Sequence, residues 1–124
     1  MLGVTERNTS SSMIKLNISE NHKLLYFNIP KELIEMLHLT ENDLLEYDIR
    51  GNQFYCRKKG SEAMPRNTDT NVFAGLKVER TITRNNTILR TNLPKEVAQP
   101  LTIQKGDVVE ITLEKKVLIG TKIY

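Results

Sequence analysis

Residues 77–95 hold the side chains best suited to bind an anion, because cationic groups recur there along two predicted paired strands. Residues 57–95 contain 9 Lys/Arg against 3 Asp/Glu, whereas residues 1–56 contain 5 against 8 and residues 96–124 contain 4 against 4. A guanidinium on a paired strand can hold a phosphate through two hydrogen bonds, and it can also reach a guanine edge. This stretch therefore supplies most of the candidate nucleic-acid contacts: Lys77, Arg80, Arg84, Asn85, Asn86, Arg90 and Lys95.

Other interpretations of this basic stretch stay open. The same face can simply be solvated, and Asn85 and Asn86 can stabilise the turn in which we expect them instead of touching a base. Arg80 falls at a position that alternation directs inward. Because an unpaired buried guanidinium is costly, we expect Arg80 at one end of the core. The N-terminal half offers fewer cations at matching positions, and only Lys15 and Lys23 are added from it as DNA contacts.

The other reactive side chains form no catalytic or metal-binding pattern. His22 and His38 have no metal-ligand spacing to each other or to an acidic residue, and His38 is expected to pack against or cap a helix. The single cysteine, Cys56, excludes an intrachain disulfide and a Cys-rich zinc site, so we expect a small buried hydrophobe. Asp43 and Asp107 precede predicted strands, where such carboxylates shape turns. We therefore predict no enzyme activity, no catalytic residue, no cofactor and no metal.

An internal repeat must position these side chains. At an offset of 64 residues, FNIPKELIEMLHLTENDLLEYDI (27–49) aligns without a gap with TNLPKEVAQPLTIQKGDVVEITL (91–113). Asn28, Pro30, Lys31, Glu32, Leu37, Asp43 and Glu46 recur as identical residues, and the apolar positions recur as well. A unit of about fifty residues is too small to bury its own apolar faces, so we expect two units to share one β-rich core.

The repeat divides the chain into four segments. Residues 13–59 form the first unit and residues 76–124 the second. Residues 60–75 are rich in Gly, Pro, Asn and Thr, which is typical of a linker, and residues 1–12 are expected to be a flexible tail.

Each unit is predicted to contain two strands, a short helix and two more strands. In the first unit, alternating apolar residues predict a half-buried strand that begins at Ile14, and residues 20–22 are expected to turn. Pro30 should start the helix, because its fixed φ and missing N–H are harmless at a first helical position. Pro100 is incompatible with a helix interior, so the second helix should be only about one and a half turns long.

Both units resemble the AbrB/SpoVT/MazE superfamily of swapped-hairpin domains. A unit of that family runs from a basic hairpin through I-P-K-E to a short helix ending in Leu-x-Leu/Ile, then a Gly-Asp turn and a strand with alternating acidic residues. This chain has IPKE with LHLTEND, and LPKE with LTIQKGD. The resemblance implies a mainly β fold, an AbrB-type β-barrel built from two ββαββ repeats, each with one short helix. Members usually form this barrel as a homodimer, so two copies in one chain imply a pseudo-dimer, although a homodimer stays open.

The resemblance also implies a function. Family members bind DNA as transcription regulators, as chromatin-like proteins or as antitoxins that repress their own operons, and they use basic residues of the first hairpin. We therefore expect a cytoplasmic, nucleoid-associated protein that contacts duplex DNA through the first hairpin of the second unit. Arg90 matches a position where the family often has arginine, whereas the first unit has Tyr26 there. The alternative is a protein-interaction module, such as a toxin-neutralising antitoxin or a scaffold. The short apolar runs exclude a transmembrane helix.

Overall fold

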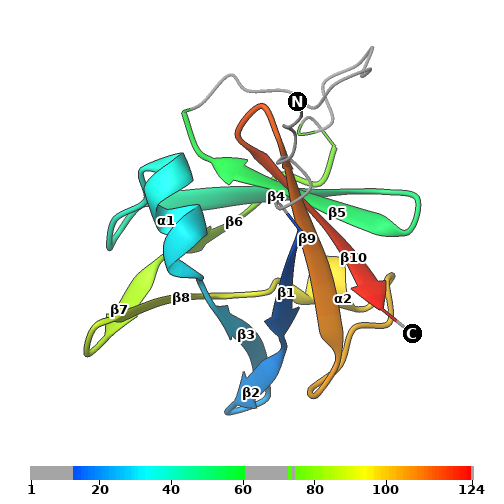
Figure 1. The fold of residues 1–124 in the computed structure, drawn as a ribbon. Helices are drawn as coiled ribbons and strands as arrows, with labels where there is room; N and C mark the ends of the chain where they lie inside the picture. Colours follow the sequence, from blue (N-terminus) through cyan, green and yellow to red (C-terminus); the bar gives the residue numbers. More distant parts are fainter. Residues whose placement is uncertain (1–12, 61–72, 74, 124) are drawn as a thin grey trace, which may run out of the picture.

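Strands dominate the fold, as the alternation of apolar and polar residues predicts. The computed structural model describes residues 13–60, 73 and 75–123; the expected tail and nearly all of the expected linker lie outside this range. The described residues form two antiparallel sheets and two short helices (Figure 1). The elements are β1 (Ile14–Asn17), β2 (Ser19–Asn21), β3 (Leu24–Asn28), α1 (Lys31–Leu37), β4 (Leu44–Arg50), β5 (Gln53–Lys58), β6 (Val78–Thr81), β7 (Thr83–Asn85), β8 (Ile88–Asn92), α2 (Lys95–Ala98), β9 (Val108–Glu114) and β10 (Val117–Ile123).

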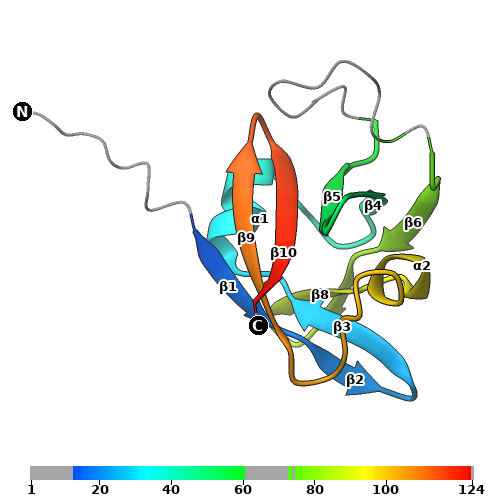
Figure 2. The same ribbon diagram turned by 90° about the vertical axis from the view of Figure 1, so that its right-hand side faces the viewer.

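Both sheets are built from strands of both halves of the chain. The larger sheet has the order β1-β9-β10-β5-β4-β6, and the smaller one has the order β2-β3-β8-β7. At the edges of the larger sheet, β1 of the N-terminal half lies beside β9, and β6 of the C-terminal half lies beside β4 (Figures 1 and 2). Each half therefore gives its first strand to the sheet region of the other.

The register of these pairs recurs at the same 64-residue offset as the sequence. Leu16 faces Val109 across β1 and β9, and the residues 64 positions away, Arg80 and Leu45, face each other across β6 and β4. Phe27 on β3 faces its own counterpart, Thr91, on β8. A pseudo-twofold axis therefore passes between β3 and β8 and relates the two halves.

The barrel implied by the resemblance does not close. The first strand of each half bends at Ile18 or Ile82, so that β1 and β6 belong to the large sheet while β2 and β7 belong to the small one. At the bend, the N–H of Ile18 donates to the carbonyl of Asp107 at 2.9 Å, and the N–H of Gly106 donates to the carbonyl of Ile18 at 2.8 Å. Because these bonds hold the bend to a loop and not to a strand, the ladder breaks there, and the expectation of a barrel is wrong.

One apolar cluster takes buried side chains from both halves. Leu33 of α1, Tyr47 of β4 and Ile82 are fully buried, as are Val97 of α2 and Ile111 of β9. Burying apolar side chains from both sides of the pseudo-axis is the main favourable contribution to folding. The halves are therefore joined by packing as well as by strand pairing.

The helices and turns follow the local signals closely, with small shifts. Pro30 and Pro94 stand just before the helices, one position earlier than expected for the first proline, and α2 has only four residues, which confirms the short second helix. The first hairpin turns at His22 and Lys23, which have φ values of 53° and 67°; the predicted turn was placed too early because Asn21 still pairs with Leu24. No helix among residues 13–60 and 75–123 is long and apolar enough to cross a membrane.

Candidate nucleic-acid interface

The outward side of the small sheet holds the most concentrated group of predicted contact residues. Phe27 and Leu89 point into the core, so the residues next to them on β3 and β8 point outward. A shallow groove of about 320 Å³ lies on this side; we term it the sheet groove. It is lined by Asn21, His22, Leu24, Tyr26, Thr83, Arg84, Asn85, Arg90 and Asn92.

Arg90 is held over an aromatic ring in this groove. Its guanidinium carbon lies 4.5 Å from the centre of the Tyr26 ring, a distance at which a cation is attracted to the ring face. Tyr26 and Arg90 are equivalent positions of the two halves, and they meet across the pseudo-axis. The Nε atom of Arg90 is buried and has no hydrogen-bond partner among the described residues. The Tyr26 ring therefore orients the Arg90 guanidinium, which still has hydrogen-bonding capacity for a ligand.

Arg84 reaches the same groove from β7. Its Nε donates to Oε1 of Glu41, in the loop before β4, at 3.0 Å. Both side chains are about half exposed, at 49% and 44%, and exposed ion pairs of this kind contribute only about 0–1 kcal/mol. A phosphate can therefore compete with Glu41 for Arg84 at little energetic cost.

The hairpin tips carry the predicted amides. Asn86 lies in the β7–β8 turn with a φ of 60°, as its position at a turn predicts. Asn85 is still the last residue of β7 and pairs with Ile88, so its expected place within the turn is wrong. Lys23 occupies the turn of the opposite hairpin, with its side chain exposed.

The other predicted contacts lie elsewhere. Arg80 is not in the core: its Nη1 donates to the carbonyl of Glu79 at 2.7 Å, and its Nη2 lies 3.7 Å from Glu96. Together with Lys23 and Lys95, it lines a second cavity near α2. Lys15 lies on β1 opposite Glu110, and Lys77 precedes β6. The structure thus gathers Arg84, Asn85 and Arg90, and it leaves Lys15 and Lys77 off both cavities.

Six residues that line the groove were not among the predicted contacts: Asn21, His22, Leu24, Tyr26, Thr83 and Asn92. Asn21, Tyr26 and Asn92 enter it because β2, β3 and β8 pair in a register that places all three on the same side. His22 enters it from the turn. The 64-residue offset was a usable signal, since Tyr26 is the counterpart of Arg90.

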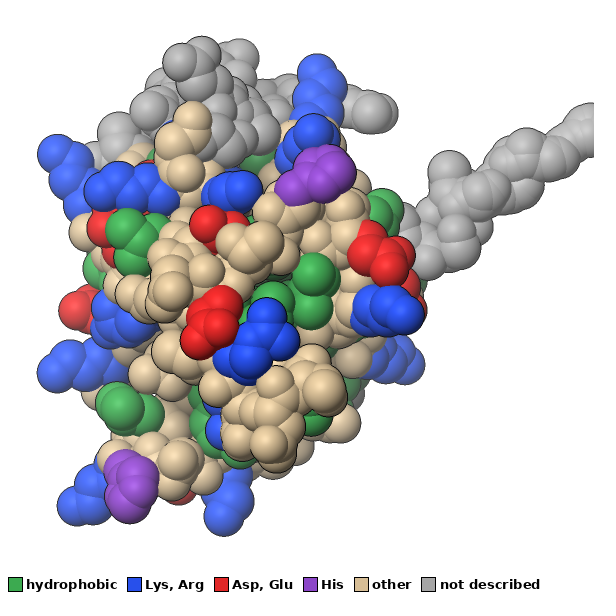
Figure 3. Space-filling model, turned by 90° about the vertical axis from the view of Figure 1, so that its left-hand side faces the viewer, with side chains coloured by type: hydrophobic (Ala, Val, Ile, Leu, Met, Phe, Trp, Pro, Cys, Tyr) green, Lys and Arg blue, Asp and Glu red, His purple; other side chains and the backbone are tan. Residues whose placement is uncertain are grey.

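Charge is mixed on the face that carries α1 and β7. Figure 3 shows Lys and Arg side chains interspersed with Asp and Glu there, with apolar side chains between them. None of the described residues that line the sheet groove is acidic, however. The groove itself is therefore more favourable to an anion than the surface around it.

The two recurring aspartates shape loops. The Asp43 carboxylate accepts the N–H of Thr40 at 2.8 Å, and the Asp107 carboxylate accepts the N–H of Gln104 at 2.7 Å. Burial raises the pKa of Asp43, but the hydrogen bonds from Thr40 and the nearby charge of Lys58 outweigh it and leave the pKa lowered. The Gln104 hydrogen bond and Lys122 lower the pKa of Asp107. Both carboxylates therefore stay ionised and hold their turns.

The remaining reactive side chains, Cys56 and His38, have structural roles. Cys56 is buried, and burial raises the pKa of its thiol to about 12, so it is a small core residue as expected. His38 ends α1 in a left-handed conformation, and its N–H donates to the carbonyl of Ile34. Within the described part of the chain, no three His, Cys, Asp or Glu side chains lie together as a metal site would require.

No family model, no curated protein and no solved structure matches this chain.

Proposed function

We propose that this protein binds duplex DNA through the sheet groove, as a transcription regulator or a chromatin-associated protein of the nucleoid. One observation carries the proposal: the small sheet brings Arg84, Asn85 and Arg90 into one groove with no acidic residue among its described lining. These side chains come from two strands that lie side by side, β7 and β8.

The chemistry of the groove suits both parts of a duplex. Arg84 and Arg90 offer planar donors to phosphate oxygens, while the amides of Asn21, Asn85 and Asn92 can pair with base edges, adenine above all. A short antiparallel ribbon fits the major groove of DNA, which is about 12 Å wide. Tyr26 restricts the Arg90 guanidinium before binding, and this reduces the entropy lost on contact.

The arrangement of strands supports the same proposal. The crossing of β1 to β9 and of β6 to β4 joins two copies of a unit whose sequence resembles the AbrB/SpoVT/MazE superfamily of swapped-hairpin domains. We propose that the chain acts as one pseudo-dimer of that type, with its two hairpin tips on either side of the sheet groove.

A salt titration tests the proposal. The affinity of labelled duplex DNA would be measured by fluorescence anisotropy at several salt concentrations, for wild type and for Arg84→Ala/Arg90→Ala. Neutralised phosphates release counterions, so removing two contacts should lower the slope of log affinity against log salt by about 2 and weaken binding roughly tenfold.

The matched control is Lys15→Ala/Lys77→Ala, which also removes two positive charges but lies off the groove. We expect a much smaller change from this variant. Equal effects of the two double variants would place DNA binding elsewhere on the surface, and salt-independent affinity would exclude phosphate contact.

Two exposed apolar side chains support a second candidate function, a protein-interaction module such as an antitoxin or a scaffold. Leu24 is 56% exposed and its counterpart Ile88 is 44% exposed, each at the start of a strand of the small sheet. An apolar partner would cover both residues. In that case, Leu24→Ser/Ile88→Ser abolishes partner binding while Arg84→Ala/Arg90→Ala leaves it unchanged.

A further inference from the structure

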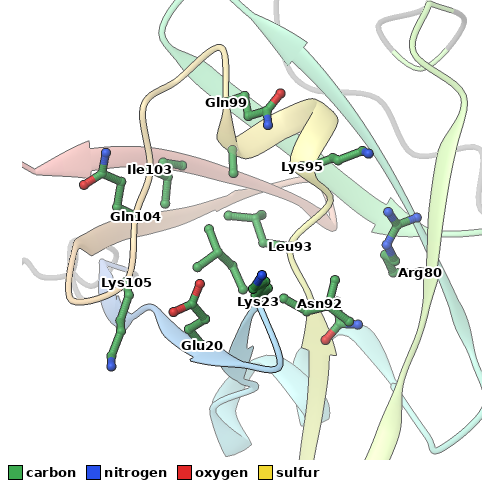
Figure 4. A pocket seen from close by; sticks show the side chains of 13 residues that line it. Glu20, Lys23, Arg80, Asn92, Leu93, Lys95, Gln99, Ile103, Gln104 and Lys105 are labelled. Carbon is green, nitrogen blue, oxygen red and sulfur yellow. The ribbon is translucent and has the colours of Figure 1, made fainter.

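A second cavity, of about 600 Å³, lies beside α2, and neither Arg84 nor Arg90 of the proposed DNA contact lines it (Figure 4). It is formed by the β2–β3 hairpin, β6, the end of β8, α2 and the loop that leads to β9; we term it the hairpin pocket. Its volume is within the range of small-molecule sites, about 300–1,000 Å³. Leu24 and Asn92 line both this pocket and the sheet groove, so the two cavities are neighbours.

The floor of the hairpin pocket is aliphatic. Leu93, Ala98 and Ile103 are buried core residues that reach its lining, and Leu25 joins them from β3. No aromatic ring belongs to the described lining, so there is no platform for stacking a flat ring. This surface favours an alkyl chain.

The rim of the pocket is cationic. Four basic side chains line it, from Lys23, Arg80, Lys95 and Lys105, against one carboxylate, Glu20. In the view of Figure 4, Arg80 and Lys95 lie at one end of the pocket and Lys105 at the other. Arg80 shares its charge with Glu96, whereas no ion pair within the described residues engages the three lysines. The rim therefore has positive charge to offer to an anion.

The equivalent region of the other half is built differently. The counterparts of the pocket residues include two cations, Lys31 and Arg84, and two carboxylates, Glu35 and Glu41, so their formal charges cancel. Arg84 and Glu41 form an ion pair at 3.0 Å, whereas their counterparts, Glu20 and Lys105, form no ion pair among the described residues. The pseudo-symmetry thus breaks in charge at this pocket.

The floor also breaks the symmetry. Ala98 stands where the other half has Ile34, which is partly buried against the core. The smaller side chain removes three carbon atoms from the floor. The smaller Ala98 side chain leaves space for a ligand on one side of the molecule, and the reversed charges make the same side more favourable to an anion.

We propose that the hairpin pocket binds a small aliphatic carboxylate, with its alkyl chain against Leu25, Leu93 and Ile103 and its carboxylate at the lysine rim. Charge complementarity and the aliphatic floor select this class over a neutral lipid or an aromatic acid. The proposal concerns the pocket alone, so it stands or falls independently of DNA binding.

Titration with decanoate, kept below its micelle-forming concentration, tests the proposal on the full chain. Backbone amide NMR shifts would be followed, and we expect saturable changes at Ala98, Ile103 and Lys105. Decanol has the same chain without the charge, and 2-naphthoate has the charge on a flat ring. Both should bind at least about threefold more weakly than decanoate.

Three substitutions locate the site. Ala98→Ile copies the other half and fills the floor, so decanoate affinity should fall at least about tenfold. Lys95→Ala removes a rim charge and should weaken binding about threefold, whereas Lys31→Ala, its counterpart in the other half, should leave affinity unchanged. The surface variants Lys95→Ala and Lys31→Ala keep the test valid even where Ala98→Ile disturbs packing. Absent shifts at the pocket, equal effects of Lys95→Ala and Lys31→Ala, or equal affinity for decanol would each overturn the proposal.

Discussion

The loop before β4 and the loop before β9 are equivalent in the two halves and make almost the same contacts, whereas the surfaces beside them differ. Lys58 of β5 contacts the loop before β4: it lies 3.6 Å from Asp43 and donates to the carbonyl of His38 at 3.1 Å. Its counterpart, Lys122 of β10, contacts the loop before β9 in the same way: it lies 3.2 Å from Asp107 and donates to the carbonyl of Thr102 at 2.6 Å. His38, which ends α1, and its counterpart Thr102, in the loop after α2, also share a left-handed φ, 55° and 54°. Backbone geometry has therefore been kept in both halves even where the residue type changed.

The surfaces beside these loops have diverged in the two places that carry our proposals. In the sheet groove, an aromatic ring of one half faces an arginine of the other. In the hairpin pocket, the signs of two charges are reversed, because Glu20 and Lys105 stand where the other half has Arg84 and Glu41. A homodimer of single units would have identical residues at both positions, so it could not pair a tyrosine with an arginine there as Tyr26 and Arg90 are paired.

The largest expected effect comes from a pair of core positions that differ between the halves. Phe54 on β5 faces Gly120 on β10, and the equivalent pair is Leu118 with Cys56. A Cβ on Gly120 would overlap the Phe54 ring, so Gly120→Cys should destabilise the fold by about 3 kcal/mol in urea unfolding.

Copying the whole pair tests whether the halves use one packing rule. Phe54→Leu/Gly120→Cys makes both pairs alike, and we expect it to regain most of the stability lost by Gly120→Cys. Cys56→Ala is the control and should cost only about 1 kcal/mol. If the double variant were less stable than Gly120→Cys, the two pairs would not follow one packing rule.

A smaller effect should follow from removing the ring under Arg90. Tyr26→Leu leaves the arginine in place but takes away a cation–π contact of about 0.5–1 kcal/mol, so duplex affinity should fall about two- to fivefold in the anisotropy assay. Tyr26→Phe keeps the ring and should bind DNA as wild type does. If Tyr26→Leu binds as tightly as wild type, positioning of Arg90 by the ring has no role in DNA affinity.

The smallest effect concerns the matched aspartates. Their pKa values are lowered in the folded state, so each stabilises the fold at pH values above its ordinary pKa of 3.8, and this stabilisation is lost as the pH falls through the lowered value. Asp43→Asn and Asp107→Asn should each cost less than about 1 kcal/mol at neutral pH, by similar amounts. Near pH 3, urea unfolding should show a smaller difference from wild type. A much larger loss at one position would show that the loops are not energetically equivalent.

Local signals in the sequence predicted much of the framework. Alternation located the strands, and proline located the helix starts and limited α2. Such signals act within a few residues, so no knowledge of distant contacts is needed. Arg84 and Arg90 were singled out in the same way, as cations on predicted strands, whereas Asn85 was singled out as a residue of the expected turn.

Long-range contacts explain what the sequence did not predict. Asp48 lies on a face that alternation directs to solvent, yet it is buried, and its carboxylate accepts the N–H groups of Ile49 and Gly75. The open barrel depends on the bonds between Ile18 and the loop before β9. The hairpin pocket depends on residues 20–25, Arg80 and residues 92–105 meeting in space, and no short window of the sequence contains all three.

The exchange of first strands has a consequence for the order in which the chain can fold. The partner of β1 is β9, which begins 94 residues later in the chain and is therefore synthesised long after β1. Until then, β1 can form no part of its native ladder, although the local hairpin of β4 and β5 can form at once. Pairing partners so distant in sequence slow folding, because loop-closure entropy is lost before the contacts form. An unpaired strand edge during that interval is open to aggregation, so the vulnerable period of this protein is its synthesis.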